Sequence, residues 1–454
     1  MRFRYPLLII FMMGFLLAPT RVTAAPQADV SADSATLEFP NTVTFSATLE
    51  ADAPIVDVTL EYGNDQLTCG EVTAKAFPDF TPGTSTDVSW TWDMRQSGSL
   101  PPGATIWWRW RYVDESGSEY LSETQSVTWL DNVHDWQTLS ESDIRLHYYG
   151  MSAEAANNML ASGIEGLRRN REQAGMTPDI PVDIFVYPNY EDMRDAILYE
   201  PQWTGGLAYS DFSIIIMGIS GDANWDQDTI IHELTHILVG RNAFTCVGFI
   251  PTWLNEGLAV YSEGELDGSM KTQLDLAIRD DTLFPLRTLG GSFSEIPEKA
   301  LLSYAQSYGV VKFMLETYGQ EKMDQLLRDL SDAKPIDAAL IERYGLDTDG
   351  LDTAWRESVG LAPLVVAQAT AMPTPTHVPT FVPISGVPLA VTPTPYAIPT
   401  SSFSETESPE VRSGPPILLT VALLCFCLML LLIVGVIVLG VVLRRGNTKG
   451  GDHV

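Results

Sequence analysis

Positively charged residues are scarce in this chain of 454 residues. Lysine and arginine together number 27, against 58 aspartates and glutamates, which gives a formal net charge of −31. A protein of this sign repels phosphate, so the composition argues against nucleic acid as a partner. The acidic excess is spread along the chain rather than gathered in a tail, and it suits a soluble, self-repelling domain.

Cysteine is also rare, with four residues in the whole chain. Cys425 and Cys427 fall within a long apolar run, and none of the four has the spacing of a cysteine metal site. Cys69 and Cys246 are far apart in the sequence. They could pair in an oxidising compartment or remain two lone thiols, and the sequence leaves both possibilities open.

Long stretches without charge occur near both ends. Residues 1–25 begin with Arg2 and Arg4, and an apolar stretch and small residues follow, in the order of a secretory signal peptide. Residues 417–443 carry no charge and exceed the roughly 20 residues that span a bilayer as a helix. Residues 444–454 begin with two arginines and are expected to stay in the cytoplasm. We therefore expect a single-pass protein of the cell membrane, attached by its C-terminal helix, with its folded part on the extracellular side.

Three segments of different composition lie between these stretches. Residues 28–133 hold short β-rich segments separated by turn signals, which predicts a β-sandwich of the immunoglobulin or fibronectin kind. Residues 136–361 hold strands followed by helices, which predicts an α+β domain. Residues 362–416 are rich in proline and threonine and predict a disordered stalk without a packed core. The predicted fold class is multidomain: sandwich, α+β domain, stalk and one transmembrane helix.

Tryptophan is concentrated in the predicted sandwich. Trp108 and Trp110 share one strand face, and filling the sandwich core is the simpler explanation for them. Trp107 and Arg109 lie on the opposite face and are better candidates for exposure. An exposed aromatic platform of this kind could instead stack on sugar rings.

Histidine is scarce as well, with six residues, and two of them fall four apart in the stretch IIHELTHILVG at residues 230–240. In a helix, His232 and His236 project from one face, one turn apart, and Glu233 lies beside them. Two imidazoles at this spacing can bind one Zn²⁺, and a glutamate beside the metal can act as general base. The stretch therefore predicts a zinc helix.

Flanking residues set the expected bounds of this helix. Asp226 and Asp228 precede the motif and are expected to cap its start, and Gly240 is expected to close it. Upstream, residues 206–219 are strand-like throughout.

A catalytic zinc takes a third protein ligand and keeps a fourth position open. Glu256 follows His236 by twenty residues, within the stretch PTWLNEGLAVY, which leaves room for a loop and an antiparallel return helix. Its apolar neighbours suggest burial, and a buried carboxylate needs a partner. We expect His232, His236 and Glu256 to bind Zn²⁺.

The motifs HELTH and NEGLA together resemble the gluzincin metallopeptidases, the peptidase MA-like group that contains thermolysin and the aminopeptidase-N-like enzymes. The resemblance covers roughly residues 136–360. It implies a zinc-dependent hydrolase acting on peptide or protein substrates, with Glu233 as general base. In related families a tyrosine-bearing helix follows the zinc site. Tyr304 is accordingly the first candidate to stabilise the oxyanion, and Tyr308 the second.

Two features depart from the family pattern. The strand that carries an amine-binding glutamate in the aminopeptidases corresponds to residues 205–210, which contain no glutamate, so aminopeptidase specificity is in doubt. Val260 replaces the thermolysin-like aspartate that supports a zinc histidine. Glu263, seven residues after Glu256 on the same helix face, is a candidate for that support, and an ordinary solvated carboxylate is the alternative.

A second function from a different class is an inactive, peptidase-derived surface module that binds glycan or protein through the sandwich. The intact set of His232, Glu233, His236 and Glu256 favours the enzyme. The sequence leaves open the substrate, endo- against exopeptidase action, the role of the sandwich and the oligomeric state.

Overall fold

The computed structural model describes residues 28–97, 99–198 and 205–363. The predicted signal peptide, the transmembrane stretch at 417–443, the tail and nearly all of the stalk lie outside the described residues. In the described ranges, no helix combines the length and the apolar character needed to cross a bilayer.

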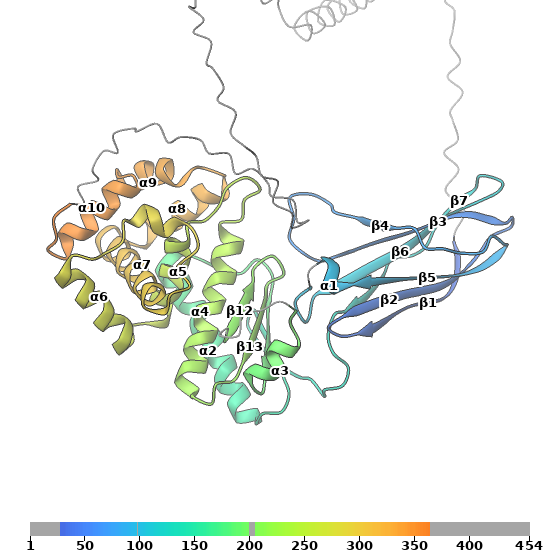
Figure 1. The fold of residues 1–454 in the computed structure, drawn as a ribbon, viewed down its shortest axis with the longest axis horizontal. Helices are drawn as coiled ribbons and strands as arrows, with labels where there is room; N and C mark the ends of the chain where they lie inside the picture. Colours follow the sequence, from blue (N-terminus) through green and yellow to red (C-terminus); the bar gives the residue numbers. More distant parts are fainter. Residues whose placement is uncertain (1–27, 98, 199–204, 364–454) are drawn as a thin grey trace, which may run out of the picture. The chain divides into compact units, whose positions relative to one another are not determined.

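The N-terminal part consists of two antiparallel sheets, as predicted for a sandwich (Figure 1). The first has the order β1-β2-β5, with bounds Asp29–Glu38, Thr42–Glu50 and Ser85–Asp93. The second has the order β4-β3-β6-β7, with β8 also paired to β6. Its bounds are Ala74–Ala76, Ile55–Asn64, Thr105–Asp114, Glu119–Leu121 and, for β8, Gln125–Thr128. A short helix α1, Met94–Ser97, follows β5.

Strict alternation along the strands builds the sandwich core. Every second residue of β6 is buried, so Trp108 and Trp110 pack inward with Ile106 and Tyr112. The core interpretation of these tryptophans is thereby confirmed. On the opposite face Arg109 is half-buried, and its guanidinium forms an ion pair with the buried Glu61 at 2.7 Å.

A third sheet, of five strands, begins the α+β part and has the order β12-β13-β11-β10-β9. The bounds are Gly206–Tyr209, Ile214–Gly218, Val182–Tyr187, Ile144–Tyr148 and Gln137–Glu141. The three inner strands are parallel, and both outer strands run antiparallel to their neighbours. The stretch 206–219, expected to be strand-like throughout, is a hairpin. It turns at Ser210–Ser213, where polar residues interrupt the apolar run.

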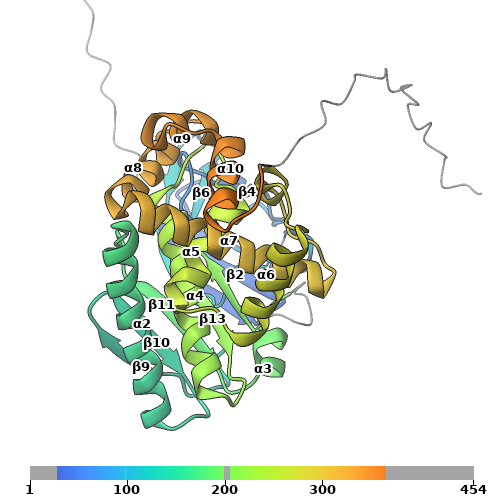
Figure 2. The same cartoon turned by 90° about the vertical axis from the view of Figure 1, so that its left-hand side faces the viewer.

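Helices make up the rest: α2 Ala153–Ala174, α3 Tyr190–Asp195, α4 Ala223–Asn242, α5 Thr252–Glu263, α6 Gly268–Asp280, η1 Leu286–Gly290, α7 Pro297–Tyr318, α8 Gln320–Ser331, α9 Ile336–Tyr344 and α10 Thr348–Ser358. Helices α2 and α4 cover one face of the five-stranded sheet (Figure 2). Gly163 allows the close approach, because a Cβ there would lie 2.7 Å from Ile144. On the other face, Phe185 and Ile216 join the apolar cluster of the sandwich. Burial on both faces explains why β11 and β13 are apolar at nearly every position.

Helix α4 is longer than the sequence suggested. Its N-cap is Asp222, whose side chain accepts hydrogen bonds from two backbone N–H groups of the first turn, so the expected caps Asp226 and Asp228 are wrong. Asp226 is instead buried within the helix and accepts a hydrogen bond from Ser220. Gly240 does not end the helix either, since α4 continues to Asn242. Gly240 instead provides the space for Ser210, whose Cβ would lie 2.4 Å from a Cβ added at Gly240.

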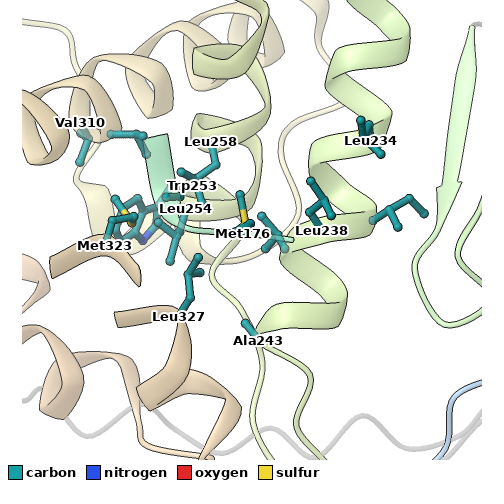
Figure 3. Close-up of a cluster of buried hydrophobic side chains, with 14 of the residues drawn as sticks. Met176, Leu234, Leu238, Ala243, Trp253, Leu254, Leu258, Val310, Met323 and Leu327 are labelled. Atoms are coloured by element: carbon teal, nitrogen blue, oxygen red, sulfur yellow. The ribbon is translucent and has the colours of Figure 1, made fainter. Parts of the chain in front are cut away.

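Apolar side chains hold α4 and α5 together. Figure 3 shows Leu234 and Leu238 of α4 with Trp253 and Leu254 of α5, and Met323 and Leu327 of α8 close to the α5 residues. These side chains are all at most 2% exposed, so truncating one leucine would cost about 2–5 kcal/mol. The two helices are therefore fixed against one another by a packed core.

A disulfide joins the sandwich to the α+β part. Cys69, in the loop after β3, pairs with Cys246, in the loop between α4 and α5. Two hydrogen bonds support the same junction: Leu67 N–H donates to the Asp211 carbonyl at 2.8 Å, and Gln66 donates to the Asp211 carboxylate at 3.1 Å. The pairing that the sequence left open is thus settled.

Candidate metal centre

The antiparallel packing of α4 and α5 brings His232, His236 and Glu256 together. The two Nε2 atoms are 3.1 Å apart, and Glu256 Oε2 lies 3.6 Å from His232 Nε2 and 3.4 Å from His236 Nε2. Three potential ligand atoms from two helices therefore converge on one point.

Two observations indicate that this group suits zinc. Tetrahedral ligands at about 2.0–2.1 Å from a zinc ion lie about 3.3 Å from one another, close to the three separations here. In addition, Glu256 Oε2 is buried and has no hydrogen-bond partner within the described residues. A buried carboxylate oxygen without such a partner is costly unless a cation completes its environment.

The remaining imidazole nitrogens are held from outside. Glu263 Oε1 lies 2.5 Å from His232 Nδ1, and Asn255 Oδ1 lies 3.1 Å from His236 Nδ1. These contacts fix the ring orientations and direct both Nε2 atoms toward Glu256. Glu263 was the sequence candidate for this support. The contact of Asn255 was not predicted, although its position beside Glu256 in the NEGLA motif was the available signal.

The charges of the histidines and glutamates shift one another's pKa values. Burial lowers the pKa of His232, but the carboxylates of Glu256 and Glu263 outweigh it and hold the pKa well above its ordinary value. Burial likewise opposes the charge of His236, and Glu256 raises the pKa of that ring. Burial would raise the pKa of Glu256, but the two histidines hold it well below its usual range.

Glu233 lies beside the ligands in a cavity of about 390 Å³. Strand β12 lines the same cavity, and a Cβ added at Gly206 would lie 3.0 Å from Glu233 Cγ. Burial raises the pKa of Glu233, even though the histidines oppose this shift. A carboxylate with a raised pKa is suited to take up and release a proton near neutral pH.

The two candidate tyrosines on α7 differ in their surroundings. Burial raises the pKa of Tyr304 well above its usual range, and the charges of Glu256 and Glu233 add to this shift. Tyr308 instead places its hydroxyl 3.5 Å from Glu265 and 3.3 Å from Lys312. The structure thus separates two residues that the sequence could only rank.

A buried set of hydrogen-bonded polar side chains near the site was also not predicted from the sequence. Asn170 of α2 donates to the Thr235 hydroxyl at 2.9 Å, and that hydroxyl lies 2.6 Å from the hydroxyl of Ser262. These three side chains join α2, α4 and α5 in the interior. Thr235 stands inside the HELTH motif at a position where the motif leaves the residue unspecified, so nothing in the pattern marked it.

Comparison with known proteins gives one family. Residues 162–379 match the family model of the Peptidase MA superfamily. A search of the curated proteins finds no match to this chain.

Two solved structures are among those that match this chain. A mutant of the M1 zinc metallopeptidase from Deinococcus radiodurans is 14% identical, covers 75% of this chain and 95% of its own, and has a TM-score of 0.35. Legionella pneumophila aminopeptidase A, in complex with aspartic acid, is 12% identical, covers 69% of this chain and 47% of its own, and has a TM-score of 0.30.

Proposed function

Residues 162–379 belong to the Peptidase MA superfamily, and from this premise we propose that the chain is a zinc-dependent metallopeptidase that hydrolyses peptide bonds. The observation that carries the proposal is the convergence of His232, His236 and Glu256 within 3.1–3.6 Å. These three residues would hold the metal. Zinc bound there would polarise a carbonyl group and lower the pKa of water.

Glu233 supplies the proton transfers. Its carboxylate lies in the cavity beside the ligand set and accepts a proton from the attacking water. The same group then delivers that proton to the nitrogen of the leaving amine. A raised pKa in the buried site makes both transfers accessible to one side chain.

Tyr304 stabilises the negative oxygen that forms when water attacks the peptide carbonyl. Its pKa is raised, so the hydroxyl stays protonated and can donate a hydrogen bond to that oxygen. A donor held in place before the reaction needs no rearrangement as charge develops.

Strand β12 positions the substrate backbone. It is the outermost strand of its sheet and lines the cavity through Gly206, Leu207 and Ala208. An extended peptide can therefore add to this edge by backbone hydrogen bonds, which places its carbonyl groups near Glu233.

We also propose that this peptidase domain works outside the cell, attached to the cell membrane through residues 417–443. The uncharged stretch, the signal-like residues 1–25 and the disulfide between Cys69 and Cys246 support export to an oxidising compartment.

The substitution Glu233→Gln tests the proposal. The variant should keep its zinc, measured by elemental analysis, and lose hydrolysis of a mixed peptide library by several orders of magnitude. Glu265→Gln is a matched control, because the Glu265 side chain is 87% exposed and belongs to no part of the site. Full activity in Glu233→Gln would remove this mechanism.

The alternative of an inactive surface module that binds glycan or protein makes the opposite forecast. A zinc-loaded native protein that cleaves no peptide of the library but binds a glycan array would favour that second function. The intact ligand set and its two supporting contacts favour the enzyme.

A further inference from the structure

The cavity of the candidate centre continues into two others. A second cavity of about 450 Å³ shares Ala208 and Ser210 with it, and it is lined on its far side by Ser99, Leu100 and Pro101 of the sandwich. A third cavity of about 1080 Å³ shares three residues with the second and extends over the sandwich. Those shared residues are Asn64, Gln66 and Trp92. The groove formed by these three cavities leads from the candidate centre onto the other domain.

The groove follows strand β12. Gly206 lies against Glu233, and Ser210 lies at the junction with the second cavity. At about 3.3 Å per residue, the four steps between Gly206 and Ser210 span about 13 Å, the length of about four residues of an extended peptide. A strand added to this edge would reach the sandwich after about four residues.

The sandwich is fixed at this junction. The disulfide between Cys69 and Cys246 ties the loop after β3 to the loop between α4 and α5. Hydrogen bonds from Leu67 and Gln66 to Asp211 also tie the loop after β3 to the turn of the β12–β13 hairpin. These contacts hold the two domains together beside the second cavity, which both domains line.

Among the described residues that line the cavity of the candidate centre, no carboxylate is left to accept an α-amino group. Among the described residues that line the first cavity, the carboxylates are those of Glu233 and Glu256, and the proposed mechanism uses both. The residues of β12 add none. A free N-terminus one residue from the reacting carbonyl would thus lack a partner in the described part of the site.

We propose, resting on the function proposed above, that the enzyme is an endopeptidase and that the groove binds the substrate on the N-terminal side of the scissile bond. Antiparallel pairing is the more stable arrangement per residue, and it runs that side of the substrate from Gly206 toward Ser210. The substrate is an internal, extended polypeptide segment. Its residue about four positions before the cleaved bond enters the second cavity, where Leu100, Pro101 and Phe212 suit an aliphatic or aromatic side chain.

A peptide series tests the inference with the zinc-loaded protein. Acetylated peptides with one cleavable bond carry two, four or six residues before that bond. The peptides with four or six residues have leucine or serine four positions before it. We expect kcat/KM to rise at least about tenfold from two to four residues, and leucine to exceed serine at that position. A requirement for a free amine, or a rate that depends only on length after the bond, overturns the inference.

The same peptides distinguish a failure of the proposed function from a failure of this inference. A zinc-loaded protein that cleaves neither blocked nor free peptides refutes the peptidase assignment, and with it this inference. Cleavage of peptides with free amines only refutes the inference alone.

A substitution in the groove provides the second arm. Ser99→Trp fills the second cavity and should reduce the rate ratio of six-residue to two-residue peptides toward one. Ser85→Trp, at the exposed start of β5, is the matched control and should keep the native ratio. Zinc content and melting temperature verify that both variants fold. An unchanged ratio in a folded Ser99→Trp protein overturns the role of the groove.

Discussion

His232, His236 and Glu256 give the metal-free protein a pH dependence of a definite sign. The folded pKa of each histidine is raised, so their contribution to the free energy of unfolding is fully present below about pH 6.5 and is lost as pH rises through the raised values. The folded pKa of Glu256 is lowered, so its contribution is present above about pH 4.5 and is lost as pH falls through the lowered value. The metal-free site is most stabilising between these limits.

Zinc reverses the first part of this dependence. The metal requires neutral imidazoles, so protons compete with it below the raised histidine values. We expect removal of zinc with a chelator to lower the melting temperature more at pH 8 than at pH 5.5, measured by calorimetry. A larger effect of the chelator at pH 5.5 would contradict the proposed ligand set.

The two tyrosines of α7 offer a paired test. Tyr304→Phe should lower kcat by about 10²-fold or more, with little change in zinc content, because a donor to the developing oxyanion is removed. Tyr308→Phe removes a hydroxyl that faces Glu265 and Lys312 and should change kcat little. Steady-state kinetics on one peptide decide the matter. Equal effects of the two substitutions would leave Tyr304 without its proposed role.

The sequence identified the residues of the candidate site better than their supports. A helix places residues four apart on one face, so the convergence of His232 and His236 followed from spacing alone. The partner of His236, Asn255, comes from another helix and depends on how α4 and α5 pack. Thr235 depends on a third helix as well. Such contacts are tertiary, so the spacing within one helix does not determine them.

Helices α5 and α7 approach each other closely at Gly257. A Cβ there would lie 2.5 Å from the backbone oxygen of Ser307, which cannot move without shifting α7. We expect Gly257→Ala to destabilise the protein by about 1–3 kcal/mol, measured by denaturant unfolding, and to lower activity by displacing Tyr304.

Gly268 provides the matched control for that substitution. It is the first residue of α6, and no atom lies within 4 Å of an added Cβ. Gly268→Ala should be neutral or slightly stabilising, since alanine restricts the unfolded chain. A neutral Gly257→Ala would mean that α7 tolerates displacement.

Element types were predicted well, and element ends were not. The alternating pattern of β6 and the spacing of the two histidines in α4 indicated the type of each element. The N-cap at Asp222 and the turn at Ser210–Ser213 depend on single polar residues that compete with other aspartates and serines nearby. Neighbouring aspartates and serines could form the same cap or turn, and tertiary packing determines which residue does so.

At the scale of the whole molecule, the disulfide couples the two domains. It closes a loop with a sequence separation of 177 residues, for which chain entropy gives a stabilisation of about 2–5 kcal/mol. We expect the double substitution of Cys69 and Cys246 by serine to lower the free energy of unfolding by that amount, measured with denaturant. The native protein, measured in the presence of a reductant, should show the same decrease in the free energy of unfolding. A protein with unchanged stability would show that the junction is held by its other contacts alone.

The exposed edge of β12 has a consequence for inhibitors. Hydrogen bonds across a strand pair involve every second amide of the added chain. N-methylation of a peptidomimetic should therefore abolish binding at alternate positions and be tolerated in between, giving a period of two. Methyl groups at the tolerated positions would also protect the compound from cleavage by other proteases, so potency and durability need not conflict.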